Sequence, residues 1–252
     1  MNQKLNGKRF AGQQGNVALL CVYLGIFLTT ILTAPSIPLA SKSSETAKLI
    51  TVRVDAGEFW GSGVLIAQQD RFYRVLTNAH VLSKDITKYP IHTHDGKVYE
   101  GVVIASAQEF KGDDLALLQF QSQKGIKYKL AQLGKTPPAG SEVLASGFPS
   151  PQLGEKNPGW VFNQGVVWQL LQKPLQGGYQ LGYTNTIKKG MSGGPLLNQA
   201  GEVVAINGMH AYPLLGRPYI YKDRTIPGEI IIEDMARHSW GIPMEKIVIP
   251  EN

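Results

Sequence analysis

The stretch KKGMSGGPLL, residues 188–197, surrounds one serine with three glycines and ends in an apolar run. Glycine reaches backbone conformations that other residues adopt only under strain. Such a bend lets a serine hydroxyl stand clear while nearby amide groups point at one spot, as a nucleophile requires. The same letters are also ordinary turn punctuation between two strands, because Gly-Gly-Pro favours turns in any protein. The stretch alone leaves both interpretations of Ser192 open.

Short strand-like runs around this turn predict an all-β protein. They are rich in Val, Ile, Leu, Tyr and Phe, and clusters of Gly, Asp, Asn and Lys separate them. The first set covers residues 49–54, 61–67, 72–82, 98–105 and 114–120, and the second covers 142–149, 159–171, 179–187, 193–198 and 202–208. Two groups of short strands favour paired antiparallel barrels or a sandwich.

The end of the chain holds the best helix candidate, at about residues 229–240. This run follows Pro-Gly, carries acidic residues early and Arg and His late, and reaches a glycine. A polar segment marked by Pro and Gly separates the two sets of strands. We therefore expect a first barrel at about 46–122, a linker at about 123–141, a second barrel at about 142–228, and this C-terminal helix.

Residues 1–40 predict an export signal. Three basic residues precede the apolar run 17–34, and small residues follow it. Cleavage is expected after Ala34 or Ala40, which leaves a domain of about residues 41–252. The alternative is a retained anchor facing outward, because eighteen mostly apolar residues approach the length that spans a bilayer.

The cysteine count and the charge narrow the class of protein. Cys21 is the only cysteine and lies within the apolar run, so the exported domain must be held together by core packing without disulfides. That favours a bacterial protein of the periplasm or the cell exterior. The net charge is +6, but no run of Lys or Arg is long enough to suggest a nucleic-acid partner.

A serine nucleophile needs a base, and the base needs an orienting carboxylate. His80 ends an apolar strand in TNAHVL, and Asp114 opens the strand DLALL, although Asp113 competes for that role. The spacing places the histidine and the aspartate in the first set of strands and Ser192 in the second. The three side chains would therefore meet in a cleft between two lobes.

The segments TNAHVL, DLALL and GMSGGPLL resemble, in this order, the three signature segments of the trypsin-like serine peptidases, which have the chymotrypsin fold. The likeness covers about residues 46–245 and is closest to the bacterial Deg-type proteases, which also show GSGV before the histidine strand. It implies two six-stranded antiparallel β-barrels followed by a C-terminal helix. It also implies a serine endopeptidase with protein or peptide substrates and with no cofactor or metal.

The resemblance assigns roles residue by residue. His80 is the expected general base and Ser192 the nucleophile. Asp114 is preferred to Asp113 as the orienting acid, because the family's acid stands directly before Leu-Ala-Leu. The amide groups of Gly190 and Ser192 are expected to form the oxyanion hole. The residue before the serine, a methionine here, is an aspartate in animal enzymes that pairs with a freed N-terminus, so no such activation is expected.

The resemblance also implies where the P1 side chain of a substrate binds. Thr186 and Ile187 would form one wall of this pocket, and Asn207 and His210 the other. Thr186 occupies the position of the carboxylate that selects Lys or Arg, so basic P1 residues should be poor. Ile187 and Asn207 favour a small aliphatic P1 residue. An acidic P1 is the alternative, through His210 and the lysines at 188–189.

Two further alternatives stay open. A pseudoprotease would use the same fold to grip peptides without cutting them. The segment HTHD, residues 92–95, places two histidines on one face of a strand and could bind a metal. No third ligand is evident nearby, so a polar hairpin tip is the favoured interpretation.

Overall fold

The computed structural model describes residues 39–151, 156–212 and 219–250. The expected export segment lies outside the described residues, apart from its last two positions. In the described part of the chain, no helix combines the length and the apolar character needed to cross a membrane.

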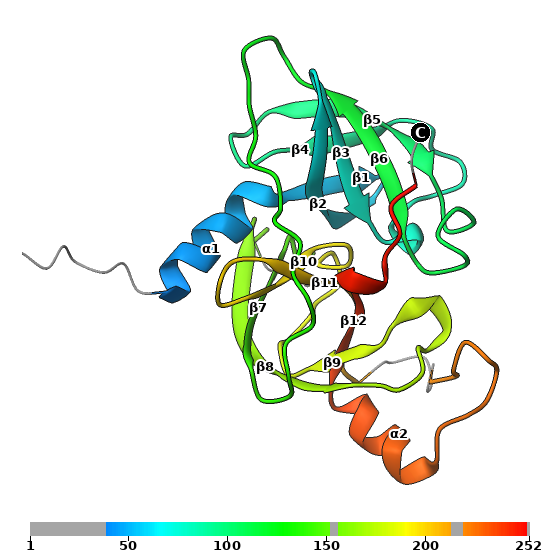
Figure 1. Ribbon diagram of the computed structural model, residues 1–252. Helices are drawn as coiled ribbons and strands as arrows, with labels where there is room; N and C mark the ends of the chain where they lie inside the picture. The colour runs from blue at the N-terminus through cyan, green and yellow to red at the C-terminus, as the bar shows by residue number, and fades with distance from the viewer. Residues whose placement is uncertain (1–38, 152–155, 213–218, 251–252) are drawn as a thin grey trace, which may run out of the picture. The chain divides into compact units, whose positions relative to one another are not determined.

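Six strands close into a first antiparallel barrel, seen in the upper part of Figure 1. In chain order they are β1 (Thr51–Ala56), β2 (Phe59–Gln69), β3 (Phe72–Thr77), β4 (Tyr89–His92), β5 (Val98–Ala105) and β6 (Ala116–Gln121). Neighbours around the barrel run β1-β2-β3-β6-β5-β4. Aromatic rings fill much of the interior, where Tyr73 and Tyr99 stack on Phe120 and Tyr128 meets all three edge-on.

Six more strands close into a second antiparallel barrel. They are β7 (Glu142–Gly147), β8 (Val161–Leu170), β9 (Leu181–Tyr183), β10 (Pro195–Asn198), β11 (Val203–Met209) and β12 (Ser239–Pro243), and they neighbour one another in the order β10-β11-β12-β9-β8-β7. The prediction of two six-stranded antiparallel barrels is therefore confirmed.

The last strand lies after the predicted C-terminal helix. Helix α2 (Glu229–Ala236) begins where the sequence predicts but ends four residues early, and β12 follows it to complete the second barrel. The five residues of β12 are all buried, and Trp240 pairs with Gly182 of β9. Burial and strand pairing outweigh the helical pattern here, because sequence propensity is a weak prior against tertiary packing.

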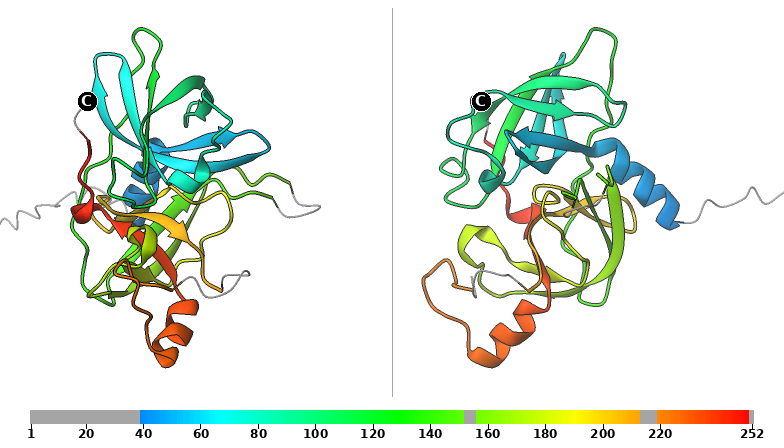
Figure 2. Two further views of the ribbon diagram at one scale, coloured as in Figure 1. Left: turned by 90° about the vertical axis from the view of Figure 1, so that its right-hand side faces the viewer. Right: turned by 180° about the vertical axis from the view of Figure 1, so that it is seen from behind.

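A second helix, α1 (Leu39–Ile50), leads into β1 and was not expected from the sequence. Ala47 and Ile50 are fully buried, and the Ser43 hydroxyl donates to the Gln199 carbonyl at 2.8 Å. Figure 2 shows α1 and α2 at different sides of the described domain. The bond from Ser43 thus links α1, which leads into the first barrel, to the turn between β10 and β11.

The two barrels share one apolar cluster. It includes Leu76 and Leu117 of the first barrel, Leu144 and Ile206 of the second, and Ile50 of α1, all with at most 4% exposure. The connecting segment contributes main-chain bonds to both barrels, from Ala131 to Leu65 and from Gly134 to Val203. Three short 3₁₀ helices complete the described elements: η1 (Ala79–Val81), η2 (Gln176–Gly178) and η3 (Met244–Lys246).

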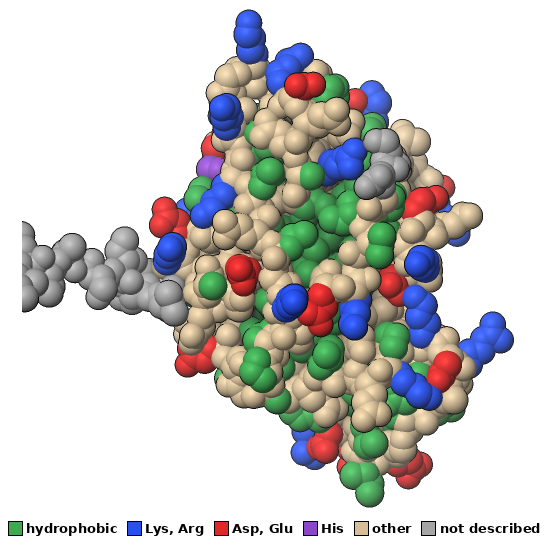
Figure 3. All heavy atoms as spheres, viewed as in Figure 1, with side chains coloured by type: hydrophobic (Ala, Val, Ile, Leu, Met, Phe, Trp, Pro, Cys, Tyr) green, Lys and Arg blue, Asp and Glu red, His purple; other side chains and the backbone are tan. Residues whose placement is uncertain are grey.

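Charged side chains of both signs are mixed over the face of the molecule that Figure 3 shows. On the face seen in Figure 3, Lys and Arg side chains alternate with Asp and Glu side chains. This distribution agrees with the lack of a long basic run in the sequence.

Candidate active site

Strand pairing in the first barrel brings His80 to Asp114. The end of β3 pairs with the start of β6, with Thr77 opposite Ala116, so the residues just beyond these ends are neighbours. The Asp114 carboxylate accepts from the His80 backbone N–H through Oδ1 at 2.9 Å and contacts His80 Nδ1 through Oδ2 at 2.5 Å. The Asn78 side-chain amide donates to the Asp114 carbonyl at 2.8 Å and fixes the loop.

The carboxylate of Asp114 is held in its charged form. Burial raises the pKa of Asp114, but the hydrogen bonds from His80 and Tyr179 and the attraction of His80 outweigh burial, so its pKa lies below the usual range. The Asp114 side chain is 18% exposed, whereas the His80 side chain is 48% exposed. The acid is thus sheltered while the imidazole faces solvent and any bound substrate.

Asp113 has a different set of partners. Its Oδ1 lies 2.5 Å from Lys222 Nζ, an ion pair between the first barrel and the loop before α2. Of the two candidate acids, Asp114 is the one that contacts His80.

Ser192 sits in a tight loop between β9 and β10. The Met191 N–H donates to the Lys188 carbonyl at 3.0 Å, which closes a turn. Gly190 and Gly193 have φ of +90° and +84°, values that favour glycine. A Cβ at Gly193 would lie 2.1 Å from the Ser62 carbonyl oxygen and 3.1 Å from the Asn78 nitrogen. The chain beside Ser192 therefore packs against Asn78, two positions before His80.

Ser62 of the GSGV segment clamps the serine loop. Its N–H donates to the Ser192 carbonyl and its Oγ donates to the Gly190 carbonyl, both at 2.8 Å. The same Oγ accepts from the Phe148 N–H at 2.9 Å. The sequence indicated GSGV only as part of a resemblance, and the structure gives it this physical role.

Two amide groups of the serine loop, those of Gly190 and Ser192, are the candidates for an oxyanion hole. The Lys189 carbonyl accepts from the Ser150 N–H at 2.8 Å, so the Gly190 N–H on the opposite side of that trans peptide faces away from Ser150. Within the described residues, neither the Gly190 N–H nor the Ser192 N–H donates a hydrogen bond to the protein. Unpaired donors on a glycine turn are what an oxyanion hole requires.

The Ser192 hydroxyl itself donates to the Gly208 carbonyl at 3.3 Å. This long bond is weak by the usual distance criteria. Among the described residues, no hydrogen bond joins Ser192 Oγ to His80. Catalytic hydrogen bonds of this kind often tighten only once substrate is bound.

The four residues expected to form the pocket for the substrate's P1 side chain differ in how exposed they are. Asn207 is fully buried, and its side-chain amide bonds internally to Tyr183, Pro195 and Ser146. Its carbonyl accepts from the Gly193 N–H at 2.8 Å, which supports the serine loop. Asn207 thus acts on this region through its backbone.

The other three residues expected to line this pocket differ in burial. Ile187 is 5% exposed and packs in the apolar interior of the second barrel, with Met191 among its neighbours. Thr186 and His210 are exposed. Lys189 lies with its Nζ 4.2 Å from the centre of the Phe59 ring, which holds this positive charge at the edge of the loop.

The HTHD segment forms the tip of the β4–β5 hairpin, as expected. The Thr93 N–H donates to the Lys97 carbonyl and the Gly96 N–H to the Thr93 carbonyl. His92 Nε2 lies 2.7 Å from an Asp55 carboxylate oxygen, whereas His94 meets the Tyr128 ring edge-on. The two histidines therefore have separate partners.

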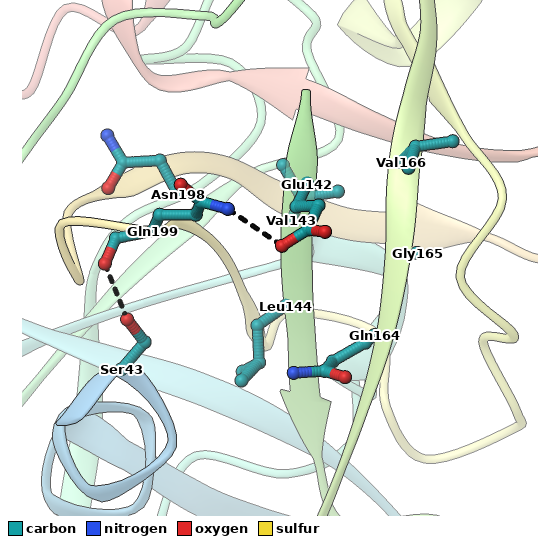
Figure 4. A pocket seen from close by; sticks show the side chains of 9 residues that line it. All are labelled: Ser43, Glu142, Val143, Leu144, Gln164, Gly165, Val166, Asn198 and Gln199. Carbon is teal, nitrogen blue, oxygen red and sulfur yellow. Dashed lines mark hydrogen bonds between the residues drawn. The ribbon is translucent and has the colours of Figure 1, made fainter. Parts of the chain in front are cut away.

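A hollow of about 260 Å³ lies beside α1 on the second barrel (Figure 4). Gln199 reaches across it to accept from Ser43 and to donate to Glu142. Its lining consists of Ser43, Glu142, Val143, Leu144, Gln164, Gly165, Val166, Asn198 and Gln199. None of these is a residue expected to act in catalysis or substrate binding.

The chain matches the profile of the trypsin-like peptidase domain over residues 61–206, more than half of its 252 residues. The chain belongs to the trypsin-like peptidase family. The match extends from the GSGV segment to Ile206 of β11 and so includes His80, Asp114 and Ser192.

Two curated relatives show which branch of the trypsin-like peptidases the chain resembles. The serine endoprotease DegS of Salmonella typhimurium is 31% identical over 150 residues, which is 58% of this chain and 38% of DegS. A probable periplasmic DegP-like serine endoprotease of Buchnera aphidicola is 31% identical over 150 residues, 58% of this chain and 29% of that protein. The expected likeness to Deg-type trypsin-like peptidases is confirmed, and the chain spans well under half the length of these relatives.

A solved structure agrees on the fold. The crystal structure of the serine endoprotease from Yersinia pestis superposes with a TM-score of 0.59 at 23% identity, covering 84% of this chain and 64% of that one. The fold described above is thus similar to that of the Yersinia pestis endoprotease.

Sequence reasoning did not single out Tyr179. Its hydroxyl donates to Asp114 Oδ2, the same oxygen that contacts His80. The residue lies in QGGYQLGY, where it looked like one apolar strand position among others. The pair of glycines before it was the available signal of an unusual backbone path.

Proposed function

We propose that this protein is a serine endopeptidase that hydrolyses peptide bonds through His80, Asp114 and Ser192 and an acyl-enzyme intermediate. The observation that carries the proposal is the pair of contacts that Asp114 makes with the backbone N–H and the ring of His80. The segment that carries His80 packs directly against the Ser192 loop. Membership of the trypsin-like peptidase family supports it.

The chemistry follows from where the imidazole proton lies. An ionised Asp114 beside Nδ1 keeps the proton on that nitrogen, so Nε2 is free to accept. His80 then removes the proton from Ser192 Oγ as the oxygen attacks the substrate carbonyl, and returns it to the leaving amine. The N–H groups of Gly190 and Ser192 stabilise the oxyanion, and losing one such donor typically costs about 10²–10³ in rate. Water then hydrolyses the acyl-enzyme by the same route.

We assign the substrates to proteins or peptides with a small aliphatic P1 residue. Ile187, next to the serine loop in the sequence, is apolar, and Thr186 offers no carboxylate to a basic side chain. The exposed lysines at 188–189 discriminate only weakly in favour of an acidic P1, because solvent and salt screen exposed charges.

A peptide-library cleavage profile of the full chain tests this P1 preference. Cleavage after Val or Ala is the expected result. A profile dominated by Glu would overturn the preference, and one dominated by Arg would overturn the assignment of the pocket.

The place of action is proposed to be the periplasm or the cell exterior. The basic start and apolar run before residue 40 support export, and one relative is named as a periplasmic endoprotease. Retention of the apolar run would leave the same domain anchored and facing outward.

A fluorophosphonate probe that labels reactive serines tests the catalytic proposal. The wild-type full chain should be labelled and should hydrolyse casein, whereas Ser192→Ala should lose labelling and about 10⁶ in kcat while staying folded. The weak bond of Ser192 to Gly208 favours one alternative, a pseudoprotease with an idle serine. A folded wild-type protein that binds peptides but is neither labelled nor active would establish that alternative.

A further inference from the structure

Tyr179 is built into the wall behind Asp114. It is 5% exposed, and its hydroxyl donates to Asp114 Oδ2. The carboxylate therefore receives three donors: the His80 N–H on Oδ1, and the His80 ring and the Tyr179 hydroxyl on Oδ2. Three donors in fixed positions hold both the plane and the charge of a carboxylate.

The backbone before Tyr179 packs closely against the segment that carries Asp114. Gly177 and Gly178 have φ of +77° and +85°. The Gly177 carbonyl accepts from the Asp114 N–H at 2.8 Å, and a Cβ at Gly178 would lie 2.6 Å from Asp113 Cγ. The second-barrel segment thus lies directly on the acid's own backbone and delivers Tyr179 to its side chain.

Gly208 makes room for the tyrosine ring. A Cβ at Gly208 would lie 2.3 Å from both Cε1 and the hydroxyl oxygen of Tyr179, so no larger residue fits. The carbonyl of the same glycine accepts from Ser192 Oγ. Strand β11 therefore has no side chain at the one place where the tyrosine approaches Asp114.

We propose that Tyr179 is a positioning residue of this peptidase, which acts through Asp114 to fix the orientation and protonation of His80. This inference rests on the proposed function and names a fourth member of the same site. The hydrogen bond of the Tyr179 hydroxyl goes to Asp114 and not to Ser192, so its effect is expected in kcat and not in KM.

The charges around the site give the direction of the pH effect. Within the described residues, the titratable groups that act on the Asp114 carboxylate are His80 and Tyr179, while the adjacent Asp113 is paired with Lys222. Burial and the negative charge of Asp114 raise the pKa of Tyr179 well above its usual value, so the hydroxyl stays protonated and donates throughout the working range. Removing the Tyr179 hydroxyl takes away one hydrogen bond to the Asp114 carboxylate. More of the carboxylate's negative charge is then left to stabilise the imidazolium form of His80.

The experiment compares Tyr179→Phe with the wild-type full chain on a peptide substrate. Phe keeps the ring and removes one hydrogen bond to a charged group, so kcat should fall about 10-fold with KM unchanged. The acid limb of the profile of kcat/KM against pH should move to higher pH. Tyr73→Phe is the matched control, because it also removes a buried hydroxyl, which accepts from the Tyr128 N–H at 3.0 Å in the first barrel.

The outcomes separate the possible explanations. A wild-type kcat and an unmoved acid limb in Tyr179→Phe, with the wild type active, would overturn this inference alone. An equal fall in kcat in Tyr73→Phe would also overturn it, because the effect would then be one of general stability. Partial recovery of kcat in Tyr179→Ala with Gly208→Ser, relative to Tyr179→Ala, would support it, since the new hydroxyl lies where that of Tyr179 was.

Discussion

Asp114→Asn is expected to lower kcat by about 10⁴, equivalent to about 5.5 kcal/mol of transition-state stabilisation. The hydrogen bonds predict how the amide will orient. The His80 N–H donates to Oδ1 at 2.9 Å, so the asparagine oxygen must take that place, since the opposite orientation would set two donors against each other. The amide nitrogen then faces His80 Nδ1 and donates to it. The imidazole proton moves to Nε2, which can no longer accept a proton from Ser192.

Steady-state hydrolysis of a chromogenic peptide, with circular dichroism to verify folding, measures this effect. Asp113→Asn is the matched control, because it removes the ion pair with Lys222 and leaves the bonds to His80 in place. Partly exposed ion pairs contribute little, so kcat in the control should stay within about threefold of wild type. A crippled Asp113→Asn beside a healthy Asp114→Asn would refute both the choice of acid and the tautomer reasoning.

Two further outcomes are expected. Met191 cannot form an ion pair with a freed N-terminus. A chain that begins at Ser41 with extra residues fused in front should therefore cleave a peptide substrate as fast as one without them. A large loss of activity caused by the extension alone would contradict this. Burial raises the pKa of Asp95, but hydrogen bonds from Lys97 and Thr93 outweigh burial and lower it to about 2. The contribution of the Asp95 carboxylate to stability is therefore present above pH 4 and is lost as the pH falls toward 2. The difference in Tm between wild type and Asp95→Asn should shrink over that range. A constant difference would count against the hydrogen bonds of Asp95 as the source of that stability.

The sequence predicted the strands whose patterns are local and missed those that depend on distant partners. Residues 98–105 form β5 with the predicted bounds, because a run rich in Val, Ile and Tyr favours a strand whatever its distant partners are. The buried strand at Ser239–Pro243 reads as the tail of a helix until its pairing with β9 and β11 is known. The α1 helix was missed, since residues 39–40 were assigned to the export segment and residues 49–50 to the first strand.

The candidate site shows the same difference between features with a local pattern and features that depend on tertiary contacts. Motif order was enough to predict that His80 and Asp114 would meet, and they do. The hydroxyl of Tyr179 reaches Asp114 from a segment 65 positions later, along a path set by two glycines in left-handed conformations. No local pattern encodes that approach. Asn207 was expected to face a substrate, but its amide satisfies three groups inside the barrel, a choice that only tertiary hydrogen bonding reveals.

The clamp made by Ser62 has a consequence for how this protein fails. One residue of the first barrel holds both the serine loop and the end of β7 in the second barrel. The carbonyl groups of Gly190 and Ser192 thus accept their hydrogen bonds from the other barrel. A molecule whose barrels separate therefore loses the Ser62 bonds to the serine loop together with the apolar cluster that the barrels share. Partly unfolded copies are then inert toward their neighbours, which suits a protease held together without disulfides.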